Sequence, residues 1–491
     1  MRHHIFYEML INRALTLYII GFLLLVEGVF MVMPGLMSLS YGEPDSNVFF
    51  WSAGATMLVG GLLVFLFDNH STDVSKRDSY VIVTLVWVCF TLFGLLPFWL
   101  SGAMPFVDAL FETMSGFSTT GSTMLANIEK ASHGILFWRS LLQWLGGMGI
   151  IALSLVLVPA LGMGSMQAFT AEASLTRSDK IHPKVTEMAR YMWYIYIAMT
   201  FVLISLYLFG GMSVFDASCH ALSTVSTGGF STRTASIGAF NSSYIEYVTI
   251  IFMFLGGVNY VLYYSIIAGK GSRLLNDDEL RSYSFLTLIS AIAVSAILYF
   301  VGNYDSIEVA FRHGFFHIVS VITGSGFTTC DYMLWPVQTT TIIAFIMFCG
   351  GCTGSTTGGI KFMRLTIMAR NIKNELKRAM HPTAVVPVKY NGKSLMPADA
   401  SSVLTFIVFY VVIIMVGILI ISLTGCSLED SFGLAVNSLG NVGVSIGHYG
   451  PSGTLVNLPS IAKITMTLLM LIGRLEIFTV ILIFTPSFWK R

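Results

Sequence analysis

Long apolar stretches alternate with short polar segments along the whole chain, at the spacing of membrane-spanning helices. The stretches long enough to cross a bilayer are roughly residues 15–36, 49–67, 80–100, 135–159, 191–210, 244–268, 282–301, 339–368, 401–423 and 460–484. Shorter segments of mixed polarity lie between members of the last eight stretches, and we expect them to re-enter the membrane without crossing it. The pattern predicts ten spanning helices and four re-entrant ones.

The re-entrant segments carry one motif four times. Residues 117–123 read FSTTGST, and related sequences return as VSTGGFS, ITGSGFT and LGNVGVS. The copies align without a gap on Gly121, Gly229, Gly326 and Gly443. Two positions upstream of each shared glycine also recur. Thirteen residues before the glycine stand Asp108, Asp216, His313 and Asp430, and six residues before it stand Ser115, Ser223, Ser320 and Asn437. Four tandem repeats are the simplest explanation.

Each repeat consists of an apolar helix, a shorter helix opened by a polar residue, the glycine motif and a second apolar helix. The expected units are a hairpin over 1–75 and repeats over 76–180, 181–280, 281–395 and 396–491. We therefore predict an all-α polytopic membrane protein with four tandem helix–pore-loop–helix repeats in a pseudo-fourfold arrangement around one ion pore. An extra two-helix hairpin precedes the repeats.

The glycine motif suits a cation filter. We expect the polar residue at the start of each short helix to cap free N–H groups, so that the partially negative C-terminal end points at the motif. Four such ends would stabilise a dehydrated cation, and backbone carbonyls would replace its water. The candidate filter residues are Thr119, Thr120, Gly121, Thr227, Gly228, Gly229, Gly324, Ser325, Gly326, Asn441, Val442 and Gly443.

The second helix of the third repeat contains the sequence GGCTGSTTGGIK at residues 350–361. Five glycines with Ser and Thr do not hold an α-helix well, and unwound backbone in hydrocarbon must be shielded or wetted. We expect this loop to face the pore below the filter and to act as a gate; the alternative is an ordinary helix with small residues for close packing. A phosphate-binding loop is excluded, because Ile360 occupies the lysine position.

The same register in the other repeats holds the pairs Gly146-Gly147, Gly256-Gly257 and Gly473-Arg474. We expect Arg474 to form an electrostatic barrier and to donate hydrogen bonds to the glycine-rich loop, and a salt bridge with Glu476 or another carboxylate is the alternative. The candidate gate residues are Gly350, Gly351, Gly354, Ser355, Thr356, Thr357, Gly358, Gly359, Lys361 and Arg474.

Another intramembrane carboxylate, Glu27, lies outside the repeats and is assigned a packing role, protonated or internally paired.

Composition and charge narrow the classes of function that this chain can have. The chain is 55% hydrophobic and 11% charged, whereas soluble proteins carry about a quarter charged residues. The formal net charge of +1 gives no reason to expect nucleic acid. The six scattered cysteines make no zinc site, and we find no catalytic motif, so no enzyme and no organic cofactor are expected. A sodium- or proton-coupled secondary transporter remains the alternative, although it predicts inverted repeats with two broken helices, and here a single interrupted helix is expected.

Charge placement predicts the orientation. Lys and Arg gather before the first repeat, after each second apolar helix and at the end of the chain, at Lys76, Arg77, Arg177, Lys180, Lys184, Arg190, Lys270, Arg273, Arg281, Lys361, Arg364, Arg370, Lys373, Lys377, Arg378, Lys389, Lys393, Lys490 and Arg491. By the positive-inside rule these segments are cytoplasmic. The re-entrant segments then enter from outside.

Together these motifs resemble the Trk/Ktr/HKT superfamily of potassium transporters, specifically its TrkH-type subunits. The resemblance covers nearly the whole chain and includes the four glycine motifs, the preceding hairpin, residues 350–361 and the pair Gly473-Arg474. It implies potassium uptake across a bacterial inner membrane, with potassium as the substrate at the filter.

The resemblance also implies partners and selectivity. Similar proteins usually form homodimers and work with a cytosolic TrkA-type nucleotide-binding subunit, for which the basic loops are the natural docking surface. Some relatives with serine at the first filter glycine favour sodium, so four glycines imply potassium. The fourth copy, Gly440 to Gly443, lacks the Thr or Ser of the others, and discrimination over sodium is therefore expected to be modest.

Overall fold

The computed structural model describes residues 11–70, 75–160, 185–267, 269, 271–302, 304–384 and 386–489, and these are almost entirely helical. The first hairpin and the first two repeats contain α1 (Arg13–Ser40), α2 (Ser46–Leu66), α3 (Lys76–Gly94), α4 (Leu96–Leu100), α5 (Phe106–Phe117), α6 (His133–Ala160), α8 (Val185–Phe209), α9 (Val214–Val225), α10 (Ser243–Gly256) and α11 (Tyr260–Ile267). Among the basic residues assigned to the cytoplasm, Arg177, Lys180, Lys184, Lys270, Lys490 and Arg491 lie outside the described residues.

The second repeat ends with α12 (Ser272–Asn276). The last two repeats follow with α13 (Asp278–Phe300), α14 (Ile307–Ile322), α15 (Val337–Ile346), α16 (Phe362–Met380), β1 (Lys389–Tyr390), β2 (Lys393–Ser394), α17 (Pro397–Ser422), α18 (Leu428–Gly440), α19 (Ser460–Arg474), α20 (Ile477–Ile481) and α21 (Pro486–Trp489). Short 3-10 turns occur after the glycine motifs and near the C-terminus, at η1 (Ile128–Lys130), η2 (Ser236–Phe240), η3 (Tyr332–Leu334), η4 (Gly447–Tyr449) and η5 (Leu482–Phe484).

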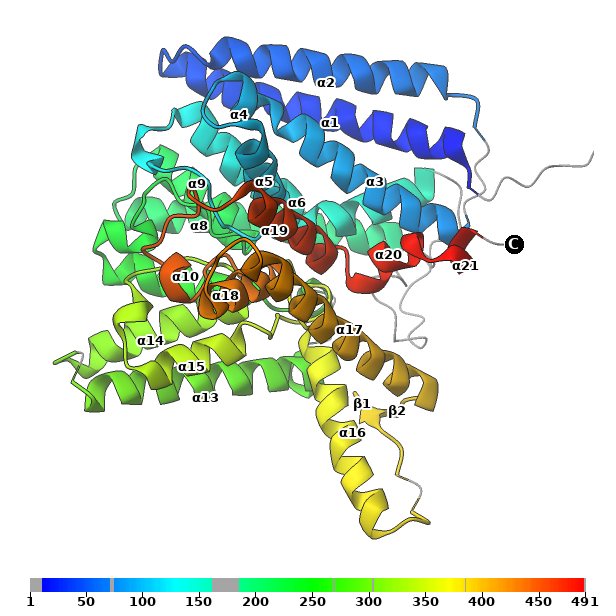
Figure 1. The fold of residues 1–491 in the computed structure, drawn as a ribbon, viewed down its shortest axis with the longest axis vertical. Helices are drawn as coiled ribbons and strands as arrows, with labels where there is room; N and C mark the ends of the chain where they lie inside the picture. The colour runs from blue at the N-terminus through cyan, green and yellow to red at the C-terminus, as the bar shows by residue number, and fades with distance from the viewer. Residues whose placement is uncertain are drawn as a thin grey trace, which may run out of the picture.

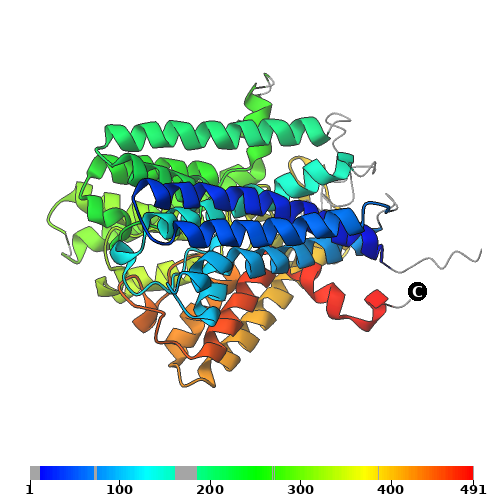
Figure 2. The ribbon, with the colours of Figure 1, turned by 90° about the horizontal axis from the view of Figure 1, so that it is seen from above.

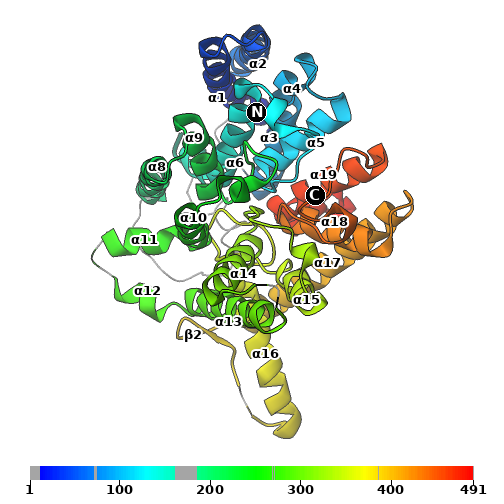
Figure 3. The ribbon, with the colours of Figure 1, turned by 90° about the vertical axis from the view of Figure 1, so that its left-hand side faces the viewer.

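The long helices run side by side, and α1 begins at the same end of the bundle at which α21 lies (Figures 1 and 2). Seen along the bundle, the four repeats succeed one another around a centre, and the hairpin of α1 and α2 lies outside the ring (Figure 3). In the described part of the chain, six single helices and two bent pairs are long and apolar enough to cross a membrane. The predicted fold class is confirmed.

The first hairpin is held by small residues and by polar contacts to the first repeat. A Cβ on Gly21 would lie 2.8 Å from the carbonyl oxygen of Gly60, so the two helices approach as closely as glycine allows. At the hairpin loop, Glu43 Oε1 lies 2.8 Å from Nδ1 of His133, the first residue of α6. Glu27 is 1% exposed, and its carboxylate oxygens have no hydrogen-bond partner among the described residues.

Three of the four second helices are broken, where the sequence predicted one interruption. The second repeat bends by 90° between Gly256 and Tyr260, and the fourth bends by 111° between Arg474 and Ile477. Both breaks lie at the glycine register noted in the sequence. Glycine at these positions lowers the stability of the helix. At the fourth-repeat break Glu476 has a φ of 59°, which a continuous helix cannot contain.

The second helix of the third repeat is interrupted between Ile346 and Phe362, as the sequence predicted, so the stretch 339–368 does not form one continuous spanning helix. Helix α15 ends after ten residues, and the chain leaves helical geometry until α16 begins at Phe362. Helix α16 then extends sideways beyond the perimeter of the bundle (Figures 1 and 3). Its sequence alternates apolar and basic residues, and this composition does not suit a transmembrane segment.

Candidate functional site

The four glycine motifs share one backbone conformation. In each motif the first and third candidate filter residues have φ angles between 51° and 96°, and the residue between them does not. The residues with positive φ are Thr119, Gly121, Thr227, Gly229, Gly324, Gly326, Asn441 and Gly443. For β-branched Thr119 and Thr227 this is a rare conformation, which persists only where the surroundings impose it.

The motifs close into a ring through their glycines. A Cβ on Gly121 would lie 2.1 Å from Gly228 O, and one on Gly229 would lie 1.7 Å from Ser325 O. The same relation continues around the ring, from Gly326 to Val442 O at 2.7 Å and from Gly443 back to Thr120 O at 2.4 Å. Each repeat therefore presents the carbonyl of its middle residue against the glycine of the preceding repeat. A ring of carbonyl oxygens of this kind is what a dehydrated monovalent cation requires.

Exposure follows the same fourfold pattern. The third residue of each motif, which is always glycine, is partly exposed, and the two residues before it are buried. The structure thus brings all twelve candidate filter residues together and leaves an accessible surface only at the level of the four glycines. No group of three or more His, Cys, Asp or Glu side chains suited to a metal ion occurs among the described residues.

The short helices α5, α9, α14 and α18 lead into the ring, but their polar residues do not cap them as predicted. Asp216 and Asp430 are the third residues of their helices, and the N-caps are Ser213 and Ser427, whose hydroxyls accept from the backbone N–H of those aspartates. A carboxylate in the first turn still suits the helix dipole. His313 is the seventh residue of α14, because that helix begins earlier than the sequence indicated.

The residue six positions before the shared glycine braces the filter backbone in three of the four repeats. Ser115 Oγ donates to Ser122 O at 2.6 Å, and Ser320 Oγ donates to Phe327 O at 2.7 Å. In the fourth repeat the bond is reversed, since Asn437 Oδ1 accepts from Gly443 N at 2.7 Å. These bonds tie the filter strands of three repeats to their own pore helices.

The fourth motif compensates for its missing hydroxyls with an amide. Asn441 Nδ2 donates to Thr120 Oγ1 at 2.9 Å and to Met470 O at 3.2 Å. In the first and third repeats, hydroxyl pairs within the motif take this place, such as Ser118 with Thr120 at 2.6 Å. The asymmetry noted in the sequence therefore joins the fourth repeat directly to the first.

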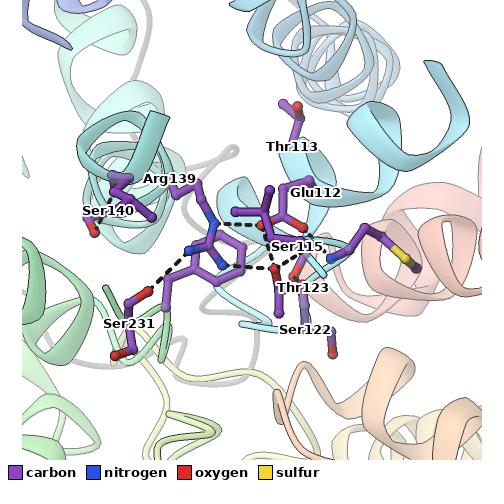
Figure 4. Close-up of polar contacts among 12 residues, drawn as sticks. Glu112, Thr113, Ser115, Ser122, Thr123, Arg139, Ser140 and Ser231 are labelled. Carbon is purple, nitrogen blue, oxygen red and sulfur yellow. Dashed lines mark hydrogen bonds and ion pairs between the residues drawn. The ribbon is translucent and has the colours of Figure 1, made fainter. Parts of the chain in front are cut away.

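A buried ion pair that the sequence analysis missed also braces the filter (Figure 4). Arg139 Nε and Glu112 Oε1 lie 2.6 Å apart, and both side chains are 1% exposed or less. Glu112 Oε2 accepts from Met124 N at 2.6 Å, and Arg139 Nη1 donates to Ser231 O at 3.1 Å. The pair therefore links the segments that follow the glycines of the first and second motifs. Glu112 and Arg139 lie nine and eighteen positions from Gly121, so no local motif indicates them.

Breaking this pair should destabilise the protein strongly. We expect Glu112→Gln or Arg139→Met to cost about 3–5 kcal/mol, because each leaves a buried partner uncompensated. The double variant should cost less than the sum of the two. Thermal unfolding in detergent measures the effect, and Arg378→Met, which removes the exposed pair with Glu375, is the control with an expected cost of about 0–1 kcal/mol. Equal losses for Arg139→Met and Arg378→Met would contradict the assignment.

The glycine-rich loop lies against the filter strands on the side of their first residues. Its two ends pair with each other, with Gly350 N donating to Ile360 O at 2.9 Å. A Cβ on Gly358 would lie 2.5 Å from Gly440 O, so the loop backbone touches the fourth filter strand. Thr356 Oγ1 lies 3.0 Å from Thr227 Oγ1, at the start of the second strand. The loop consequently occupies the space immediately below the ring.

Arg474 joins this loop to the first repeat. Its Nη1 donates to Thr356 O at 2.7 Å, and its Nη2 donates to the carbonyls of Gly146 at 2.8 Å and Gly147 at 3.1 Å. The guanidinium is thus bonded to the glycine-rich loop of the third repeat and to the glycine register of the first. Arg474 is the last residue of α19, at the point where the fourth repeat bends.

The remaining charges near the loop are paired differently from the sequence alternatives. Glu476 pairs with Arg364 at 2.6 Å. Arg364, one of the residues assigned to the cytoplasm, is the third residue of α16 and is buried. Lys361 Nζ donates to Thr357 O at 2.5 Å and to Thr357 Oγ1 at 3.0 Å. Of the remaining candidate gate residues, Ser355 shares a 2.8 Å hydroxyl contact with Thr357.

Comparisons with known proteins agree with this geometry. A family model described as TrkH, cation transport protein, matches residues 45–491. The Trk system potassium uptake protein TrkH of Halomonas elongata is 36% identical, over 98% of this chain and all of that protein. The protein of the same name from Escherichia coli K12 is 34% identical, over 98% of this chain and 99% of its own. The crystal structure of the potassium transporter TrkH from Vibrio parahaemolyticus superposes with a TM-score of 0.89 at 32% identity, covering 97% of this chain and 99% of that chain.

Proposed function

The chain belongs to the TrkH family of cation transport proteins, and on that premise we propose that it takes up potassium through the ring of four glycine motifs. Potassium is the substrate named for its relatives, and the filter chemistry fits it. The observation that carries the proposal is the cyclic contact of each filter glycine with the middle carbonyl of the next repeat. Such a ring supplies oxygen ligands without carboxylates, which suits a monovalent cation that must also leave.

The glycine-rich loop, residues 350–361, is the proposed gate. It lies directly below the filter, and its contacts with Thr227 and Arg474 span three repeats. Displacement of the loop would clear the path. We further propose that the chain works as a homodimer with a cytosolic TrkA-type nucleotide-binding subunit, in a bacterial inner membrane, with the filter mouth outside and the basic loops in the cytoplasm. The name Trk system, given to the relatives, supports partnership with other components.

A coupled secondary transporter remains the second candidate. The breaks in the second and fourth repeats resemble the discontinuous helices of such transporters. They occur at the same register of parallel repeats, however, and this arrangement favours a pore. Uptake measured with and without a proton or sodium gradient separates the two functions.

The test is uptake of rubidium-86 into proteoliposomes that contain the purified full chain. We expect external potassium to compete with the tracer more effectively than sodium does. Uptake should follow the rubidium gradient alone when proton and sodium gradients are absent. Competition by neither cation would contradict the proposed function, and strict dependence on a second gradient would favour the coupled transporter.

A further inference from the structure

One buried carboxylate bonds to both ends of the gate loop. Glu279 Oε1 accepts from Thr353 N at 2.7 Å and from Thr353 Oγ1 at 3.0 Å, near the start of the loop. The same oxygen accepts from Met363 N at 2.8 Å, just beyond the end of the loop. Glu279 is 3% exposed and lies at the beginning of α13. A single side chain thus fixes the distance between the two ends of the segment that covers the pore.

The two residues before Glu279 hold a second element. Asp278 Oδ2 accepts from Asn391 N at 2.7 Å and pairs with Arg370 of α16 at 2.7 Å. Asp277 Oδ2 accepts from Asn391 Nδ2 at 3.0 Å. Asn391 forms the turn between β1 and β2, which lie beside α16 outside the main bundle (Figure 1). Residues 277–279, the acidic triad, therefore contact the gate loop, α16 and this hairpin.

We propose that Glu279 is a positioning residue that holds the gate loop across the pore, and that the acidic triad couples the loop to the hairpin at 389–394. The inference rests on the proposed gating function of the loop. A force that displaces the hairpin moves Asp277 and Asp278, and with them the carboxylate that joins Thr353 to Met363. The hairpin carries Lys389 and Lys393, one on each strand. The part of the protein on which such a force acts is therefore positively charged.

A purely structural role, as a cap for the first turn of α16, makes a different prediction. A cap requires the bond to Met363 N, because the first N–H groups of a helix lack intrahelical partners. It does not require the two bonds to Thr353. Loss of a cap lowers stability and flux together, whereas release of a closed gate raises flux and exposes the loop.

The rate of chemical modification of Cys352 measures the exposure of the loop independently of transport. It precedes Thr353, is 0% exposed, and its backbone N–H donates to Gly257 O at 2.8 Å. In a full chain whose other five cysteines are replaced by serine or alanine, we expect Glu279→Ala to raise the rate of Cys352 modification by a methanethiosulfonate reagent about tenfold. Rubidium-86 flux without any added partner should rise in parallel. Glu279→Gln, which keeps an acceptor oxygen, should restore most of the protection, and Asn391→Ala should act like Glu279→Ala, but more weakly.

The matched control is Glu246→Ala, because Glu246 is also a buried carboxylate but pairs with Arg312 away from the loop. It should leave Cys352 protected. Unchanged labelling and flux in Glu279→Ala would overturn the proposal, as would a fall in flux with Cys352 still protected. Equal labelling in Glu246→Ala and Glu279→Ala would also overturn it. If the parent chain takes up no potassium, the proposed function fails, and the labelling result still decides whether Glu279 holds the loop.

Discussion

Substitution of Gly229 by serine should abolish most of the discrimination between potassium and sodium. A Cβ at this position would lie 1.7 Å from Ser325 O, closer than any side chain tolerates, so the ring must open or the carbonyl must turn away. The φ of 81° adds backbone strain for any L side chain. We expect the preference for potassium, measured by competition against rubidium-86 uptake, to fall by about tenfold or more, equivalent to roughly 1.4 kcal/mol.

A glycine in the same repeat provides the control. Gly211 has a φ of 91°, but a Cβ there would meet nothing within 4 Å. Gly211→Ser therefore carries comparable backbone strain without a clash in the filter. It should leave selectivity unchanged. Similar selectivity in Gly229→Ser and the parent chain would mean that the glycine ring does not select the ion.

Much of the filter could be predicted from sequence because its requirements are local. Glycine is needed where φ is positive and where a neighbouring carbonyl leaves no room for Cβ, and both conditions recur in each repeat at a fixed spacing. Gly121, Gly229, Gly326 and Gly443 could therefore be aligned without a structure. Bends in the second and fourth repeats fall at the same glycine register, but the register alone does not say whether a helix breaks there. In the first repeat α6 passes Gly146 and Gly147 without interruption.

The elements that hold the filter and gate were not predictable, because they depend on contacts between distant parts of the chain. Glu112 and Arg139 belong to different helices, and nothing in their sequence neighbourhood distinguishes them from ordinary helix charges. Glu279 similarly resembles a cytoplasmic loop residue until the fold brings Thr353 and Met363 to it. The helix-opening aspartates were misassigned as caps for a related reason. Serine three residues earlier, at the true N-cap, was equally compatible with the pattern.

Arg474 is the residue whose removal should change gating most. Three of its hydrogen bonds go to backbone carbonyls of Thr356, Gly146 and Gly147, so they connect the proposed gate loop to the first repeat through one planar group. Hydrogen bonds from a charged donor contribute about 1.5–3 kcal/mol each. In the proposed pore the guanidinium also places positive charge on the path of a cation that leaves the filter. Both effects oppose permeation.

We therefore expect Arg474→Ala to raise rubidium-86 flux into proteoliposomes by about tenfold or more, since the loop loses its bond to the first repeat and the barrier loses its charge. Arg474→Lys should give an intermediate flux, because an ammonium keeps the charge but cannot reach three carbonyls with the geometry of a planar fork. Arg233→Ala is the matched control, since Arg233 pairs with Asp216 away from the loop and should leave flux unchanged. Size-exclusion elution and thermal unfolding verify that each variant is folded. A folded Arg474→Ala protein with lower flux than the parent would show that the arginine supports permeation, and the barrier assignment would then be wrong.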